Sequence, residues 1–74
     1  MNTVQKAQKA SGVAVTDISA IIGLSVPTTY KRLKNPGSLS IDDFFKIYGE
    51  YDDVSRDVMW AYLEERRNFL CARM

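Results

Sequence analysis

The sequence predicts an all-α fold built from five helices. Three observations predict it: apolar residues recur at helical spacing, residues that favour helix starts and ends punctuate the chain, and no segment alternates convincingly as a half-buried strand does. A chain of 74 residues is expected to form a single domain with a small core. We divide it into residues 1–53 and a C-terminal helix within 54–74 that belongs to the same domain.

The first two predicted helices both end at glycine. The first runs from about Thr3 to Ala10 and stops at Ser11-Gly12, and the second runs from about Val15 to Ile22 and is closed by Gly23. Glycine tolerates the positive φ that terminates many helices. The apolar stripe of the second helix consists of Ile18, Ile21 and Ile22.

The third predicted helix begins at a Ser-Val-Pro signal. Ser25 is a favourable N-cap, and Pro27 fits a first turn because its missing N–H has no partner within the helix there. The helix is expected to reach Lys34. Asn35-Pro36-Gly37 then breaks it, because the residue before a proline avoids the helical region and glycine permits the turn.

The last two predicted helices start at serines. Ser40 is expected to cap the fourth, with Asp42 and Asp43 placed favourably in its first turn. The apolar face of this helix is Phe44, Ile47, Tyr48 and Tyr51. Ser55 is expected to open the fifth helix, which runs to Phe69 or beyond.

Charge is unevenly distributed along a chain whose net charge is only +1. Residues 1–40 carry a balance of +4, whereas residues 41–57 carry −4. Such segregation suits a protein that turns one end toward phosphate, although a small protein can also cluster charges by chance.

Composition argues against several functional classes. One cysteine and no histidine exclude an internal disulfide and disfavour a zinc site, and no metal, cofactor or small-molecule ligand is expected. The carboxylate pairs have capping or solvated roles, and there is no glycine-rich phosphate loop, so we do not expect an enzyme. We see neither a membrane-length apolar run nor a signal peptide, and we therefore expect a cytoplasmic protein without membrane contact.

The segment from Ile18 to Ser40 contains the most informative pattern. Gly23 allows the chain to reverse between two helices, Leu24 can fill the gap between them, and Ser19 is small where bulk would block their crossing. The following helix is short, basic, and narrow enough for a major groove about 12 Å wide. This order predicts a helix-turn-helix, which inserts its second helix into DNA.

This region resembles the lambda-repressor/Cro-like, or xenobiotic-response-element, family of helix-turn-helix proteins, particularly small phage or prophage regulators. The resemblance covers roughly residues 12–51. It is carried by Gly23, Leu24 and Ser25 in the turn and by Thr28, Tyr30, Arg32, Leu33, Lys34, Asn35, Pro36, Gly37 and Ser40 after it. It implies a five-helix lambda-repressor-like domain that regulates transcription by occupying a palindromic double-stranded operator as a homodimer.

The resemblance also implies roles for individual residues. The base-facing residues would be Val26, Pro27, Thr28, Tyr30 and Lys31. The phosphate-binding residues would be Ser25, Arg32, Lys34, Asn35 and Ser38. Other roles stay open: Tyr30 as a core residue, the lysines as ordinary solvated side chains, and Asn35 and Ser38 as loop chemistry only.

The chain departs from the family pattern in three places. Ala14 and Val15 stand where the family has a hydroxyl cap followed by a phosphate-binding glutamine, which puts that phosphate contact in doubt. Arg32 and Thr29 occupy positions that are usually apolar, so the core beneath the third helix is expected to be more polar than is normal for the family.

The C-terminal helix is apolar around most of its circumference, which predicts more than one buried surface. We expect the extra surface to pair two copies of the chain, although the helix may simply complete the monomer core. The expected dimer residues are Met59, Trp60, Tyr62, Leu63, Phe69 and Leu70. Trp60 and Tyr62 also fit contact with a different protein, as in a phage accessory or antirepressor module without specific DNA binding.

Overall fold

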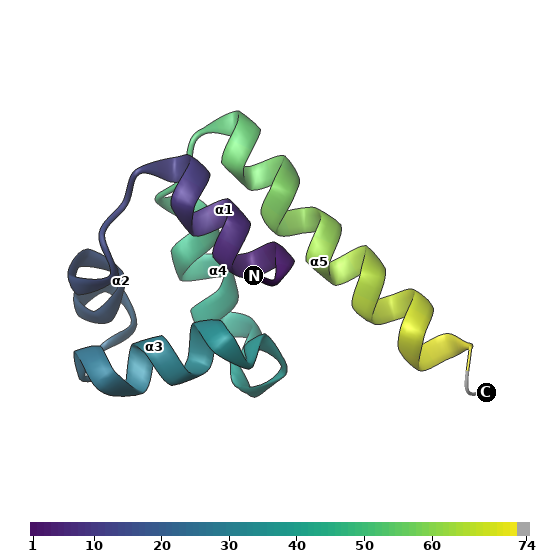
Figure 1. Cartoon of the computed structure of the whole chain (residues 1–74), viewed down its shortest axis with the longest axis horizontal. Coiled ribbons are helices and arrows are strands. Elements are labelled where there is room, and N and C mark those ends of the chain that lie inside the picture. Colours follow the sequence, from purple (N-terminus) through teal and green to yellow (C-terminus); the bar gives the residue numbers. More distant parts are fainter. Residues whose placement is uncertain (73–74) are drawn as a thin grey trace.

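The computed structural model describes residues 1–72, and in that range it contains five α-helices, one turn of 3₁₀ helix and no strand (Figure 1). The elements are α1 (Thr3–Ser11), α2 (Val15–Ile22), α3 (Val26–Lys34), η1 (Pro36–Ser38), α4 (Ile41–Gly49) and α5 (Asp53–Cys71). The all-α prediction is confirmed, and α2 and α3 have the predicted bounds. The last two residues of the predicted 54–74 segment lie outside the described residues.

The start of α1 is fastened to the end of α3. Asn2 caps α1 by accepting a hydrogen bond from the Gln5 backbone N–H (2.8 Å), and the Gln5 side chain accepts one from the Asn2 N–H (3.0 Å). The Asn2 side-chain amide also donates to the carbonyls of Leu33 (3.0 Å) and Lys34 (3.1 Å). These carbonyls have no partner within α3, so one side chain satisfies two helix ends at once.

The core lies where α1, α2 and α4 meet α3 and the first half of α5. Its fully or nearly buried apolar side chains are Val4, Ala7, Ile18, Ile22, Leu33, Phe44, Ile47, Tyr51 and Met59. Every helix contributes, which holds the N- and C-terminal parts of the chain in one unit. Burial raises the pKa of the Tyr51 phenol to about 12, since the phenolate would lose its hydration there.

The fifth helix begins two residues earlier than predicted. Its N-cap is Asp52, whose side chain accepts from the Ser55 N–H (2.8 Å), and the helix starts at Asp53. Ser55 is buried inside the first turn and does not cap the helix. The prediction that Ser55 opens the helix is therefore wrong.

The two halves of α5 have different surroundings. The first half packs against α1 and the core, and Met59 is completely buried. The second half extends past the other helices (Figure 1), and the residues from Glu64 to Ala72 are exposed. Met59 is therefore unavailable to a second chain, and its prediction as a dimer-interface residue is wrong. None of the helices in the described part of the chain is both long and apolar enough to cross a membrane.

Candidate nucleic-acid interface

Three residues, 23–25, connect α2 to α3 in a tight turn. Gly23 has φ of +71°, and its N–H donates to the Ser19 carbonyl, as does the N–H of Leu24 (3.1 Å). Ser19 is buried, and Leu24 packs against the core. A small residue below the turn, an apolar residue within it and a left-handed glycine fix the direction in which α3 leaves α2.

The first turn of α3 is capped by Ser25. The Ser25 hydroxyl accepts a hydrogen bond from the Thr28 N–H (3.3 Å) and donates one to the Thr28 hydroxyl oxygen (2.8 Å). Two of the predicted contact residues thus bond to each other in the free protein. Pro27 is exposed beside them, and Val26 is half-buried.

The buried side of α3 consists of Thr29 and Leu33. Thr29 is completely buried because its hydroxyl donates to the Ser25 carbonyl (2.9 Å), which satisfies the polar group inside the fold. This helix phase turns Tyr30 outward, where 59% of it is exposed. The alternative in which Tyr30 is a core residue is therefore wrong.

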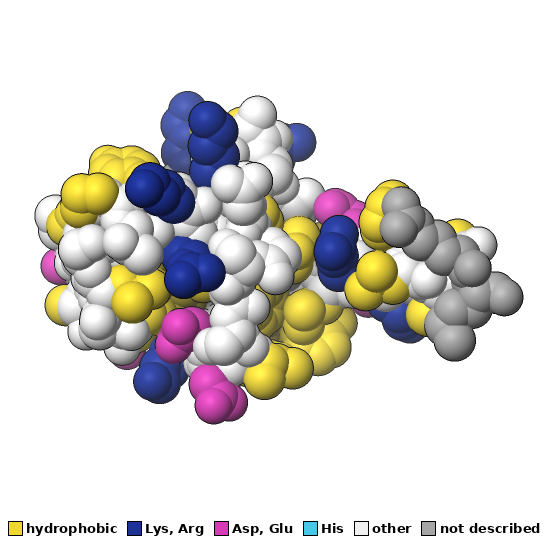
Figure 2. Space-filling view, turned by 90° about the horizontal axis from the view of Figure 1, so that it is seen from below, with side chains coloured by type: hydrophobic (Ala, Val, Ile, Leu, Met, Phe, Trp, Pro, Cys, Tyr) yellow, Lys and Arg dark blue, Asp and Glu magenta, His cyan; other side chains and the backbone are white. Residues whose placement is uncertain are grey.

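Lys31 and Lys34 lie on the outward side of α3, and both are exposed. Within residues 1–72, neither lysine has a carboxylate within ion-pair distance. Figure 2 looks from below at the side of the molecule that carries α3, and Lys and Arg side chains are prominent there while acidic side chains lie toward one edge. This surface therefore combines positive charge with an uncovered helix.

Arg32 and Ser38 hold the loop that follows α3. The Arg32 guanidinium donates to the Ser38 carbonyl (3.0 Å), and the Ser38 hydroxyl donates to the Asn35 carbonyl (2.6 Å). Arg32 is half-buried, whereas the Asn35 side chain is exposed at the end of α3. The loop is thus tied to the helix, with Asn35 beside the lysines.

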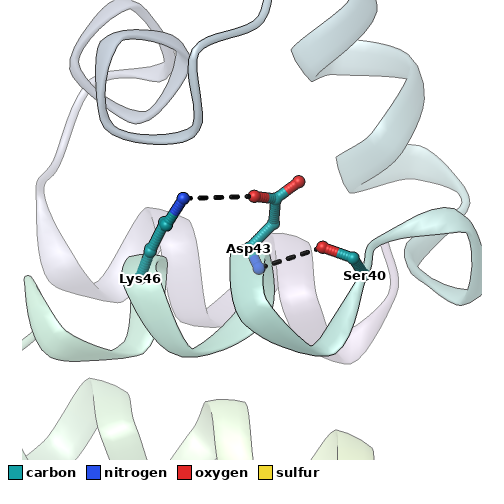
Figure 3. A network of polar contacts seen from close by, with 3 residues as sticks. All are labelled: Ser40, Asp43 and Lys46. Carbon is teal, nitrogen blue, oxygen red and sulfur yellow. Dashed lines mark hydrogen bonds and ion pairs between the residues drawn. The ribbon is translucent and has the colours of Figure 1, made fainter.

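The basic side chain of α4 is already paired. Ser40 caps α4 by accepting from the Asp43 N–H (3.1 Å), and the Asp43 carboxylate lies 4.0 Å from the Lys46 ammonium (Figure 3). This is the one ion pair within the described residues. The cations of α3 and the cation of α4 therefore have different surroundings.

The start of α2 offers no side chain for a phosphate. Its N-cap is Ala14, which makes no side-chain cap bond, and its first turn contains Asp17. Asn2 is the residue that sequence reasoning missed, since its amide positions the end of α3. The Asn2-x-x-Gln5 spacing, a capping-box pattern, was the available signal.

No group of three or more potential metal ligands occurs among residues 1–72. Comparison of the chain with protein-family models, with curated proteins and with solved structures finds no match.

Proposed function

We propose that this protein is a sequence-specific DNA-binding transcriptional regulator of the Cro/repressor kind, which inserts α3 into the major groove. The observation that carries the proposal is the exposed face of α3, on which Lys31 and Lys34 have no carboxylate partner within the described residues. Two short helices joined by a left-handed glycine have the order that a helix-turn-helix requires. Its finer assignment, the lambda-repressor arrangement, is part of this proposal.

Roles on the DNA follow from position along α3. Lys31 and Tyr30 extend from the middle of the helix, where they can reach base edges, and Pro27 offers an apolar surface to a thymine methyl. Lys34 and Asn35 lie at the end of the helix and suit phosphate contacts. Arg32 supports the loop and reaches phosphate only by leaving the Ser38 carbonyl.

Homodimer formation is part of the proposed function. Beyond the monomer core, α5 exposes Trp60 (45%), Phe69 (50%) and Leu70 (46%), with half-buried Tyr62 and Leu63 on the same helix. A two-fold dimer can place two recognition helices about 34 Å apart, one turn of DNA, on a palindromic operator. Covering these side chains would also enlarge a core that is small for a free-standing domain.

The test is selection of binding sites from a library of duplexes of about 25 base pairs, followed by salt titration. The protein is expected to enrich one palindromic sequence. Lys31→Ala with Lys34→Ala should abolish enrichment and make the slope of log affinity against log salt shallower by about 1.8, the value for two lost phosphate contacts. Enrichment of no sequence, or full binding by the double variant, would contradict the proposal.

A second candidate function, a protein-binding module, is favoured by an aromatic cluster formed by α4 and α5. The Trp60 ring lies 6.3 Å from that of Phe45 and 6.2 Å from that of Tyr48, centroid to centroid. Trp60 and Phe45 are 45% and 41% exposed, and large exposed aromatic side chains are common interface anchors. Under this alternative, Trp60→Ala would abolish partner binding while the two α3 lysines could be replaced without effect.

A further inference from the structure

A groove of about 400 Å³ runs beside α3 and has no place in the function proposed above. Its lining comes from α1, α2, α3 and the N-terminal methionine. The lining residues are Met1, Gln5, Gln8, Lys9, Val15, Tyr30 and Leu33. It therefore adjoins the recognition surface on the side to which Tyr30 points.

The polar groups of this groove are suited to an anion. No acidic residue lines it, whereas Lys9 and Tyr30 are exposed on it. The Gln5 side-chain oxygen is occupied by the Asn2 N–H (3.0 Å), so the group that Gln5 can still offer is its NH₂ donor. An ammonium, an amide NH₂ and a phenol O–H together provide hydrogen-bond donors without a competing carboxylate.

The apolar part of the groove consists of Met1, Val15 and Leu33. A concave surface with an apolar floor and donors at its edge matches a sugar-phosphate chain, which presents carbon-rich deoxyribose beside anionic phosphate oxygens. When a helix occupies the major groove, the two backbones rise on either side of it, so the strand on the Tyr30 side would meet α1.

We propose that the α1–α3 groove binds one sugar-phosphate strand of the duplex that α3 reads. Lys9 pairs with a phosphate, and the Gln5 amide and Tyr30 hydroxyl donate to phosphate oxygens of the same strand. This inference rests on the proposed function. It adds α1 to the DNA-binding surface, and it places a phosphate contact beside Val15, close to where the start of α2 lacks one.

The chain provides a matched pair of variants for the test. Lys9 and Lys6 are both exposed on α1, but only Lys9 lines the groove, so Lys9→Gln and Lys6→Gln remove the same charge from the same helix. Each is titrated with salt on a random-sequence duplex of about 25 base pairs and on the selected operator. Lys9→Arg keeps the charge and reports whether the substituted helix still folds.

Lys9→Gln is expected to make the salt slope shallower by about 0.9 and to weaken binding by a similar factor on both duplexes, leaving the specificity ratio unchanged. Lys6→Gln and Lys9→Arg should keep the slope of the original protein. Ethylation interference should lose phosphates on one strand only for Lys9→Gln. Equal slopes for Lys9→Gln and Lys6→Gln overturn the inference.

The outcomes separate this inference from the proposed function. If Lys31→Ala with Lys34→Ala weakens DNA binding but Lys9→Gln behaves as Lys6→Gln does, the groove proposal fails alone. If no duplex is bound by the unaltered protein, both proposals fail. Binding of a poly-glutamate peptide that Lys9→Gln abolishes, with the duplex slope unchanged, would instead assign the groove to an acidic protein.

Discussion

Helices α3 and α4 have the same length and the same start but opposite electrostatics. Each has nine residues and a serine N-cap, Ser25 or Ser40, that accepts from the backbone N–H three residues on. Lys31 and Lys46 both occupy the sixth position of their helix. Lys46 lies 4.0 Å from a carboxylate three residues earlier, whereas the position three residues before Lys31 is Thr28.

This difference shows why only one of two similar helices suits a phosphate-rich partner. The first turn of α4 contains Asp42 and Asp43, which compensate the positive end of the helix dipole, whereas the first turn of α3 contains no acid. The N-terminus of α3 is thus open to an external anion, and its lysines have no carboxylate to displace. The same local fold serves core packing in α4 and, by our proposal, recognition in α3.

The strongest way to break the comparison is to give α3 the acid of α4. Thr28→Asp places a carboxylate three residues before Lys31, the relation that Asp43 has to Lys46. We expect DNA affinity to fall by at least about tenfold, since a good side-chain–base contact is worth about 1–3 kcal/mol and the new charge also repels phosphate. Fluorescence anisotropy on the selected operator measures the effect.

Thr28→Asn is the matched control for this substitution. It replaces the same hydroxyl with a neutral side chain of the same shape as aspartate, so it removes the Ser25–Thr28 side-chain bond (2.8 Å) without adding charge. Its affinity should stay close to that of the unaltered protein. An equal loss in both variants would show that the side-chain bond, and not the charge, distinguishes α3.

A smaller effect is expected when the shared feature, the serine cap, is removed. Ser25→Ala and Ser40→Ala should each lower the free energy of unfolding by about 1 kcal/mol, measured by urea denaturation. Only Ser25→Ala should also weaken DNA binding, because α3 and not α4 contacts the duplex. Equal losses of affinity in the two variants would mean that binding reports stability alone.

The sequence was sufficient to locate α2 and α3 but not to fix which side of α3 is buried. An apolarity pattern admits either Thr29 or Tyr30 as the core residue between Val26 and Leu33. The structure buries Thr29 because its hydroxyl bonds to the carbonyl four residues earlier, a contact that hydropathy does not register. The exposure of Tyr30 follows from that hydrogen bond.

The C-terminal helix shows a similar limit. The run from Val58 to Leu63 is apolar throughout, so periodicity could not separate buried Met59 from Trp60, which is 45% exposed. Packing against α1 and the core decides the phase. The helix start was also misplaced because Asp52 and Ser55 are both good caps, and only the fold shows that Ser55 is buried within the first turn.

The most direct test of the central claim, that the face of α3 binds duplex DNA through unpaired cations, compares Lys31→Gln with Lys46→Gln. Both remove one positive charge from the sixth position of a nine-residue helix. Titrated on the selected operator between about 50 and 200 mM salt, Lys31→Gln is predicted to bind more weakly, and Lys46→Gln to bind as the unaltered protein does. Equal affinities for the two variants would contradict the account.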